Sequence, residues 1–285
     1  MGAVYVLAFG CYNIPMSTLI FVLIFLLGCI IGSFLNVVIY RLGTGKTMVT
    51  GGSICMTCNH HLRWYELIPI FSFLIQSGRC RKCASHISHQ YPIVEFGTGL
   101  IFTLIAFHFL PLLTFSYVSY VVLVTLFVFI FSLLMVIAVY DIRHKIIPDI
   151  LVYTYAIVSL FSVFLNTTGI GPLFVWPSLL GVLSGPLFAL PFALIWLASR
   201  GRAMGLGDAK LMLGIGWMLG PAQALAATIL SFWIGSIVSL FIMLFSHKKM
   251  GMKTEIPFAP FLIISALITF LFNLDVFSLA SLLHF

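Results

Sequence analysis

Two acidic side chains of this sequence stand where carboxylate chemistry is possible. Asp208 follows two glycines in Gly205-Leu206-Gly207-Asp208, and Asp141 ends an earlier apolar run. Neighbouring carboxylates cannot both ionise easily, so they share a proton; one can then activate water while the other protonates a carbonyl oxygen. Glycines without side chains would permit a close turn and leave room for an extended substrate. The pair therefore predicts aspartic protease chemistry.

Helix capping is the alternative interpretation of these acids. Aspartate is a good N-cap, and glycine commonly ends the preceding helix. Asp208 would then only begin a helix, and Asp141 would be a solvated charge at an interface. Asp149, which follows Pro148, is predicted even more strongly to be an N-cap. The tetrapeptide taken alone favours capping.

Two pairs of cysteines indicate a metal site. Cys55 and Cys58 form one C-x-x-C unit, and Cys80 and Cys83 form another. Two such units resemble a zinc site in which four thiolates surround the ion, at a spacing slightly beyond that of the usual zinc ribbon. Free or redox-active thiols are the alternative. The sequence predicts structural zinc.

The composition excludes a soluble domain. Hydrophobic residues make up 62% of the 285 positions and charged residues only 7%, too few to cover a water-facing surface. Apolar runs near the roughly 20 residues that a helix needs to cross a bilayer recur along the chain. The net charge of +7 is no sign of nucleic acid here, because in a membrane protein the positions of Lys and Arg matter more than their sum. An all-α polytopic membrane protein is predicted.

The Lys and Arg residues fall into four clusters. Basic loops stay in the cytoplasm, and one arrangement places every cluster there: about eight spans with both chain ends outside. The clusters are Arg41 to Lys82, Arg143 with Lys145, Arg200 to Lys210, and Lys248 to Lys253. The spans are predicted near Pro15–Tyr40, Tyr91–Leu110, Tyr117–Tyr140, Ile150–Asn166, Phe174–Ser199, two within Leu211–Phe245 separated by a turn at Gly220-Pro221, and one from about Pro257.

This topology brings the two aspartates to one side of the membrane. Asp141 closes the third span and Asp208 opens the sixth, so both lie at the cytoplasmic face. Glu66 and Glu95 lie near membrane boundaries, where a lone acid is usually only interfacial, although acids around a site would attract a basic peptide. Asn36 lies within the first span and needs a polar partner, which favours a role in helix packing. Gly28, Gly32 and Ser33 of that span would let a neighbouring helix approach closely.

Taken together, the motifs resemble the type IV prepilin peptidase family, which includes the competence pilin peptidases. The matching segments are Gly32–Arg41, the two cysteine pairs around Glu66–Pro69, Tyr91–Glu95, Asp141–Asp149, Gly205–Lys210 and Ile256–Pro260. They follow the family's order and span most of the chain. One departure is Ala259, where the family usually has glycine; the added methyl group affects the packing expected of the last span.

The resemblance implies a membrane aspartic peptidase of the bacterial cytoplasmic membrane. It would remove the short basic leader of type IV pilin-like precursors at the cytoplasmic face, with Asp141 and Asp208 as the catalytic pair. The cysteine-bearing loop implies a second activity, methylation of the new N-terminal amine with S-adenosylmethionine. Supporting residues are expected among the other motif positions: Gly205, Gly207, Asp149, Lys210, Glu66, Glu95 and Asn36.

The resemblance also implies a division of the chain. Residues 1–40 would form the first span, residues 41–90 a cytoplasmic zinc loop linked to methylation, and residues 91–285 a seven-span peptidase domain. Another membrane peptidase of the GxGD class remains a competing interpretation, as does a transporter or assembly scaffold with a zinc-stabilised loop. Transporters usually place key acids near the bilayer middle, whereas both aspartates lie at predicted span ends.

Overall fold

The computed structural model describes residues 14–45, 47, 51–167, 171–202, 204–245 and 256–278. Helices dominate these residues, and three isolated bridges are their only β pairing. The predicted cytoplasmic cluster Lys248 to Lys253 and both chain ends lie outside the described residues.

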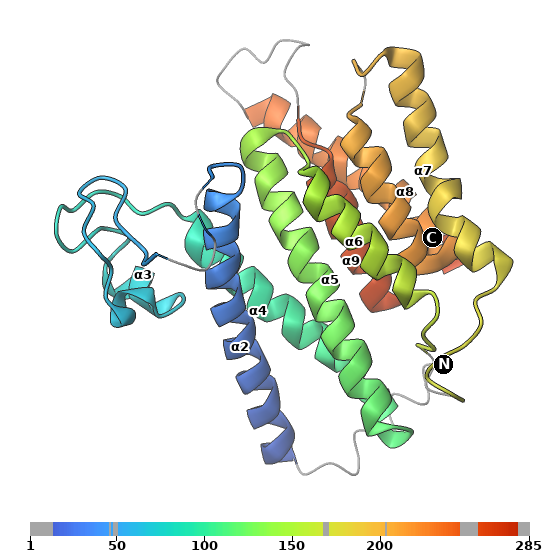
Figure 1. Ribbon diagram of the computed structural model, residues 1–285, viewed down its shortest axis with the longest axis horizontal. Helices are drawn as coiled ribbons and strands as arrows, with labels where there is room; N and C mark the ends of the chain where they lie inside the picture. Colours follow the sequence, from blue (N-terminus) through green and yellow to red (C-terminus); the bar gives the residue numbers. More distant parts are fainter. Residues whose placement is uncertain are drawn as a thin grey trace. The chain divides into compact units, whose positions relative to one another are not determined.

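Five helices are long and apolar enough to cross a membrane. Two shorter apolar helices are α6 (Asp149–Ser162) and α9 (Ala259–Phe272). The chain is therefore an all-α polytopic membrane protein, as predicted, while the count of eight crossings stays a prediction. The five long helices, labelled in Figure 1, are α2 (Ile14–Arg41), α4 (Gln90–His108), α5 (Tyr117–His144), α7 (Leu179–Ser199) and α8 (Leu206–Phe245).

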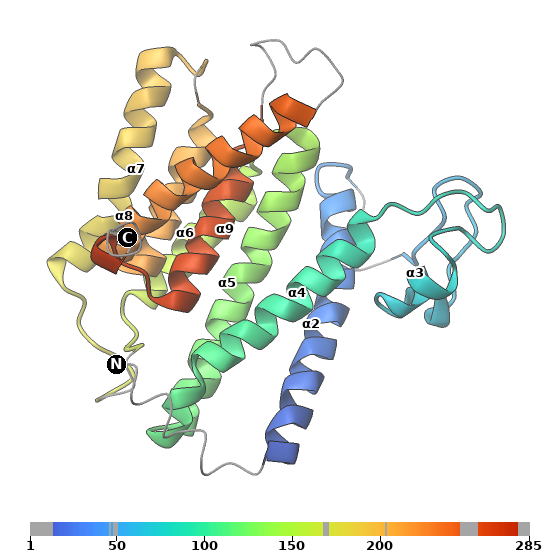
Figure 2. The ribbon, with the colours of Figure 1, turned by 180° about the vertical axis from the view of Figure 1, so that it is seen from behind.

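The described chain divides into two compact units, one up to Val136 and one from Ile137 onward, with the division inside α5. In the N-terminal unit, α2 and α4 lie against each other (Figure 2). A Cβ atom on Gly28 would come within 2.7 Å of Gly99 Cα, and one on Gly32 within 2.8 Å of Glu95 Cα. The two backbones approach so closely because these positions lack side chains, which confirms the close approach predicted for the first span. A short 3₁₀ helix, η2 (Leu110–Thr114), follows α4.

The segment between α2 and α4 carries the four paired cysteines. It contains the 3₁₀ helix η1 (Trp64–Leu67) and the short helix α3 (Phe71–Ile75), and is otherwise made of turns. The fold thus has the predicted small loop domain between the first two long helices. The packing groups α4 with α2, whereas the division predicted from the sequence assigned α4 to the peptidase part. The functional division itself remains a prediction.

In the C-terminal unit, α8 packs against α6, α7 and α9. Small residues again allow close contact: a Cβ atom on Gly216 would lie 2.6 Å from the Ser184 carbonyl oxygen. The Ser184 hydroxyl donates a hydrogen bond to the Gly216 carbonyl at 2.8 Å. Tyr155 of α6 is fully buried against Gly214 of α8. These contacts hold the start of α8 in place, and the start of α8 carries Asp208.

Helix α8 is interrupted at Gly220, whose backbone is non-helical (φ 73°, ψ 173°) and is followed by Pro221. An uninterrupted helix of this length would extend about 60 Å, twice the hydrocarbon thickness. A positive φ is inexpensive only for glycine, and proline cannot donate the next helical hydrogen bond. The turn predicted at Gly220-Pro221 is confirmed.

Two predicted boundaries were wrong. The fourth span ends at Ser162 rather than Asn166, and the fifth begins at Leu179 rather than Phe174. Residues between them pair as extended chain: Val175 N donates to Phe164 O at 3.0 Å. The Ser178 side chain then accepts a hydrogen bond from Gly181 N and starts α7 as an N-cap.

Candidate active site and metal centre

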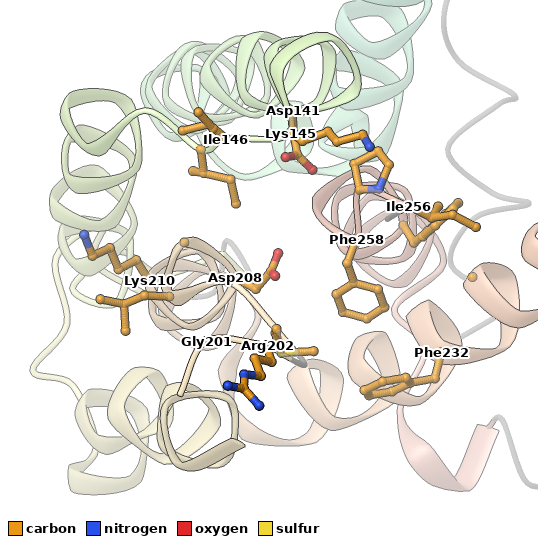
Figure 3. A pocket seen from close by; sticks show the side chains of 18 of the residues that line it. Asp141, Lys145, Ile146, Gly201, Arg202, Asp208, Lys210, Phe232, Ile256 and Phe258 are labelled. Carbon is orange, nitrogen blue, oxygen red and sulfur yellow. The ribbon is translucent and has the colours of Figure 1, made fainter. Parts of the chain in front are cut away.

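Asp141 and Asp208 line one cavity of about 1170 Å³ in the C-terminal unit. Asp141 lies in the last turn of α5 and Asp208 in the first turn of α8, and their residues are only 5% and 8% exposed. Figure 3 shows both carboxylates pointing into the same open space. We call this space the aspartate cavity. The fold therefore brings together the two residues that the sequence pairs.

Backbone amides at two helix starts act on these carboxylates. The N–H groups of Gly205 and of Ala259, at the start of α9, favour the ionised forms of Asp208 and Asp141, respectively. Unpaired N–H groups at helix starts are natural hydrogen-bond donors to carboxylates. Ala259 is fully buried, so the motif position that departs from the family pattern contributes its backbone to the site. Asp208 is a first-turn residue that faces the cavity, so capping alone does not describe it.

The two glycines before Asp208 differ in their surroundings. A Cβ atom on Gly207 would lie 2.9 Å from Ile147 Cβ, closer than real side chains approach. A Cβ atom on Gly205 would lie 3.7 Å from Asp208 Oδ2, an ordinary contact. Gly207 therefore lets the first turn of α8 pack on the loop that leads from Asp141 to α6.

An ion pair joins the same two segments. Lys210 Nζ donates to Asp149 Oδ1 at 2.6 Å and lies 4.9 Å from the Tyr153 ring centroid. In Figure 3, Lys210 points away from Asp208, on the outer side of the first turn of α8. The prediction that Asp149 is an N-cap was wrong: Pro148 holds that position, and the Asp149 side chain pairs with Lys210 instead.

Other residues lining the aspartate cavity were not singled out from the sequence. Lys145 and Arg202 add positive charge to its lining, and Phe232, Phe258 and Phe261 add aromatic rings. The rings of Phe232 and Phe258 lie 5.2 Å apart. Phe258 belongs to the Ile256–Pro260 motif and Lys145 to the Asp141–Asp149 motif, which could have indicated them. Phe232 and Phe261 lacked a sequence signal because α8 and α9 meet only in the folded chain.

The four paired cysteines form a cluster in the N-terminal unit. The Sγ atoms of Cys55, Cys58, Cys80 and Cys83 all lie within 4.8 Å of one another, and those of Cys55 and Cys83 are 3.8 Å apart. A zinc ion bonded to four thiolates at about 2.3 Å holds the sulfurs about 3.8 Å apart, so the residues fit such an ion.

Both cysteine pairs adopt the same turn. Asn59 N donates to Cys55 O at 2.9 Å, and Ala84 N donates to Cys80 O at 2.8 Å; both donor residues have positive φ, 53° and 56°. The backbone N–H groups of Cys58 and Thr57 lower the pKa of the Cys55 thiol to about 6. Turns that direct N–H groups at sulfur favour the thiolate, which is the form that binds metal.

Glu66, Glu95 and Asn36 lie in the N-terminal unit and do not line the aspartate cavity. Glu66 and Glu95 line a second cavity beside the cysteine cluster. Asn36 is fully buried; its Nδ2 donates to the carbonyl oxygens of Gly32 and Tyr91, each at 3.3 Å. Gln90 Nε2 donates to Asn36 Oδ1 at 3.2 Å. Asn36 therefore joins α2 to α4, as the packing interpretation predicted.

The fold and these sites define a class: a helical membrane protein with a paired-aspartate cavity at helix ends and a separate four-cysteine cluster. Comparison with known proteins gives the family. Residues 26–109 match the bacterial peptidase A24 N-terminal domain, and residues 128–240 match the type IV leader peptidase family. The first match contains the four cysteines and the second contains both aspartates.

Curated relatives are similar in sequence to this chain over most of its length. The prepilin leader peptidase/N-methyltransferase of Bacillus subtilis is 31% identical over 259 residues, which cover 90% of this chain and 96% of the relative. The proteins of the same name from Pseudomonas aeruginosa and Vibrio cholerae are 31% and 30% identical, covering 87% of this chain and 89% and 95% of the relatives. No solved structure matches the chain significantly. The chain belongs to the prepilin leader peptidase/N-methyltransferase family, which confirms the resemblance seen in the motifs.

Proposed function

We propose that this protein cleaves the basic leader from type IV prepilin-like precursors, with Asp141 and Asp208 as the catalytic pair. One observation carries the proposal: two buried carboxylates from different helices point into one cavity large enough for an extended peptide. The relatives named as prepilin leader peptidases support the substrate class.

The proposed reaction is hydrolysis by a shared-proton pair. One aspartate, ionised, takes a proton from water as the water attacks the scissile carbonyl carbon, while the protonated partner donates to the carbonyl oxygen. Collapse of the tetrahedral species breaks the C–N bond, and the leaving amine receives a proton. Gly205, Gly207, Asp149 and Lys210 support this pair. The N–H group of Gly205 favours the ionised form of Asp208, and the other three residues hold the first turn of α8 against the 145–149 segment.

The second proposed activity is methylation of the amine that cleavage exposes, with S-adenosylmethionine as the methyl donor. The names of the relatives as N-methyltransferases support it. Zinc bound by Cys55, Cys58, Cys80 and Cys83 would hold the loop of the N-terminal unit in shape. Glu66, Glu95 and Asn36 belong to this unit, and we assign them to methylation rather than to cleavage.

The proposed setting is the bacterial cytoplasmic membrane, with both sites facing the cytoplasm and both chain ends outside. The partners are precursor proteins with basic leaders and the lipid bilayer, not nucleic acid. The positions of the Lys and Arg clusters support this orientation.

In the deciding experiment, the purified full-length protein is incubated with a precursor, with and without S-adenosylmethionine, and the masses of the products are measured by mass spectrometry. Cleavage alone is expected without the donor, and cleavage plus one added methyl group with it. Asp141→Asn and Asp208→Asn should each lower the cleavage rate by about 10² to 10⁴, the contribution typical of general acid–base groups. The partly exposed acid Asp275, which accepts a hydrogen bond from Ser278 and does not line the cavity, provides the control variant Asp275→Asn.

Full cleavage by either cavity variant would exclude the aspartate pair. Cleavage of unrelated membrane peptides in preference to the precursor would favour a different GxGD-class peptidase. Absence of both products from folded wild-type protein would favour the transporter or scaffold interpretation.

A further inference from the structure

The short helix α3, in the segment between α2 and α4, turns apolar side chains outward. Phe71, Leu74 and Ile75 are 58%, 65% and 72% exposed. They stand at positions i, i+3 and i+4, which share one face of a helix. The two residues between them, Ser72 and Phe73, instead line the cavity beside the cysteine cluster. One face of α3 therefore packs on its own segment, and the opposite face is apolar and uncovered.

The neighbouring 3₁₀ helix η1 adds to this apolar surface. It contacts α3, and its Trp64 is 77% exposed. Leu67, at the end of η1, and Ile68, which follows it, are exposed as well. Large exposed apolar patches mark contacts with other proteins or with membranes. The residues that we call the η1–α3 patch are Trp64, Leu67, Ile68, Phe71, Leu74 and Ile75.

The start of α3 lies alongside α2 rather than beyond its end. Ile70 N, one residue before α3, donates to Glu95 Oε2 at 2.7 Å. The backbone of Glu95 packs at Gly32, where a Cβ atom would come within 2.8 Å of Glu95 Cα. Gly32 precedes Arg41, the last residue of α2, by nine residues, which is about 14 Å of helix. In Figures 1 and 2, α3 is accordingly level with the body of α2.

The two long helices present apolar side chains outward at the same level. Ile93 and Phe96, next to Glu95 on α4, are exposed, and so is Phe34, two residues beyond Gly32 on α2. Because α2 and α4 are long and apolar enough to cross a membrane, we expect these exposed side chains to face lipid. The η1–α3 patch thus continues a surface that already faces the bilayer.

The charges around the patch are of one sign. Within residues 42–89 the only acid is Glu66, which is buried. Basic clusters beside a membrane are attracted to anionic lipid headgroups, and tryptophan side chains favour the level of the headgroups. The exposed basic residues of this segment include Arg63, Arg79, Arg81 and Lys82.

We propose that the η1–α3 patch docks on the surface of a lipid bilayer that carries anionic headgroups. The apolar face of α3 enters the boundary between headgroups and acyl chains, as amphipathic interfacial helices do, and the basic residues remain among the headgroups. Docking attaches the cysteine-bearing segment to the membrane at a third place, besides α2 and α4. The proposal depends on the membrane-spanning helices and on neither of the proposed activities.

The test uses the wild-type full-length protein in lipid nanodiscs of phosphatidylcholine and phosphatidylglycerol. A small fraction of the lipid carries a photoreactive diazirine in its acyl chain, and labelled peptides are identified by mass spectrometry after irradiation. Label is expected within residues 64–76 as well as on α2 and α4. Met56, an exposed apolar residue of a cysteine turn outside the patch, is the internal control and should remain unlabelled.

Two results of this labelling would overturn the proposal. One is label on α2 and α4 with none within residues 64–76, which would favour a protein partner for the patch. The other is equal label on Met56 and on the patch. Nanodiscs of phosphatidylcholine alone should give at least threefold less label on residues 64–76, because the basic residues then lack anionic headgroups. Equal label in the two kinds of nanodisc would overturn the assigned headgroup charge.

A pair of variants tests the same surface. Ile75→Asp places a charge in the apolar face and should lower the label on residues 64–76 at least threefold, while the label on α4 stays unchanged. Ser88→Asp adds the same charge at an exposed position outside the patch and should leave both labels unchanged. Undiminished label on residues 64–76 in folded Ile75→Asp would contradict the docking. Since wild-type labelling needs no variant, it decides the proposal even where a variant fails to fold.

Discussion

At the scale of single residues, the shape of the aspartate cavity depends on a glycine that has no side chain. Gly207 has no side chain, and Ile147 occupies the space where one would start. Asp208 lies one residue further along α8, so any displacement of this turn moves its carboxylate relative to Asp141. The glycine therefore acts on the site through packing rather than through contact with a substrate.

Gly207→Ala should lower both stability and cleavage. Overpacking of this kind costs about 1–3 kcal/mol, and the turn that carries Asp208 must shift to relieve it. Gly205→Ala is the matched control for stability, because its new Cβ atom would make only an ordinary contact at 3.7 Å. Thermal unfolding of both variants and the initial rate of precursor cleavage by Gly207→Ala check the prediction. Equal thermal unfolding of the two alanine variants would contradict it.

At the scale of elements, the two cysteine turns are equivalent. Each presents two sulfurs from a turn closed by the same backbone hydrogen bonds, and the intervening η1 and α3 bring the turns together. The segment has no extended sheet and few helical residues of its own. A bound metal would therefore supply much of its stability, as it does in small zinc domains.

Replacing Cys58 or Cys83 by serine should reduce the bound zinc from about one ion per chain to near none, because three thiolates and a hydroxyl bind zinc weakly. Elemental analysis of the purified protein measures the ratio, and limited proteolysis within residues 51–88 should become faster. Cys29→Ser is the control, since Cys29 is buried in α2 against Gly99, away from the cluster. Purified wild-type protein that contains no zinc would contradict the predicted zinc site.

At the scale of the whole molecule, the shared cavity constrains the topology. Asp141 ends α5 and Asp208 begins α8, so these two helix ends must lie on the same side of the membrane. The basic residues Arg143, Lys145, Arg200 and Arg202 flank the same ends, and the preference of Lys and Arg for cytoplasmic loops predicts that this side faces the cytoplasm.

Alkaline phosphatase, which is active only outside the cytoplasm, tests this orientation. Fusions after Lys145 and after Gly201 should be inactive, whereas a fusion after Thr114, in the uncharged connection between α4 and α5, should be active. A green fluorescent reporter at the same positions should give the reverse pattern. Phosphatase activity at Lys145 or Gly201 would contradict the predicted arrangement.

Much of this protein follows from its sequence alone. The scarcity of charge and the length of the apolar runs predict a helical membrane protein, because a chain inside a bilayer must form its backbone hydrogen bonds within itself. The C-x-x-C pairs predict their own cluster, and Gly220-Pro221 predicts the break in α8, because turns and metal ligands are local features of the chain. The motifs, read together, were sufficient to predict the family.

Other relations between polar groups were decided only by the tertiary structure. The predicted topology already paired Asp141 with Asp208, and the fold gives this pair its cavity. The fold alone pairs Lys210 with Asp149 and places Glu66 and Glu95 in a different cavity from the aspartates. It also brings Phe232 of α8 to Phe258, just before α9. These relations join residues far apart in the chain, and helix packing, governed by where small residues let backbones approach, determines them. The sequence pattern within any one helix does not contain that information.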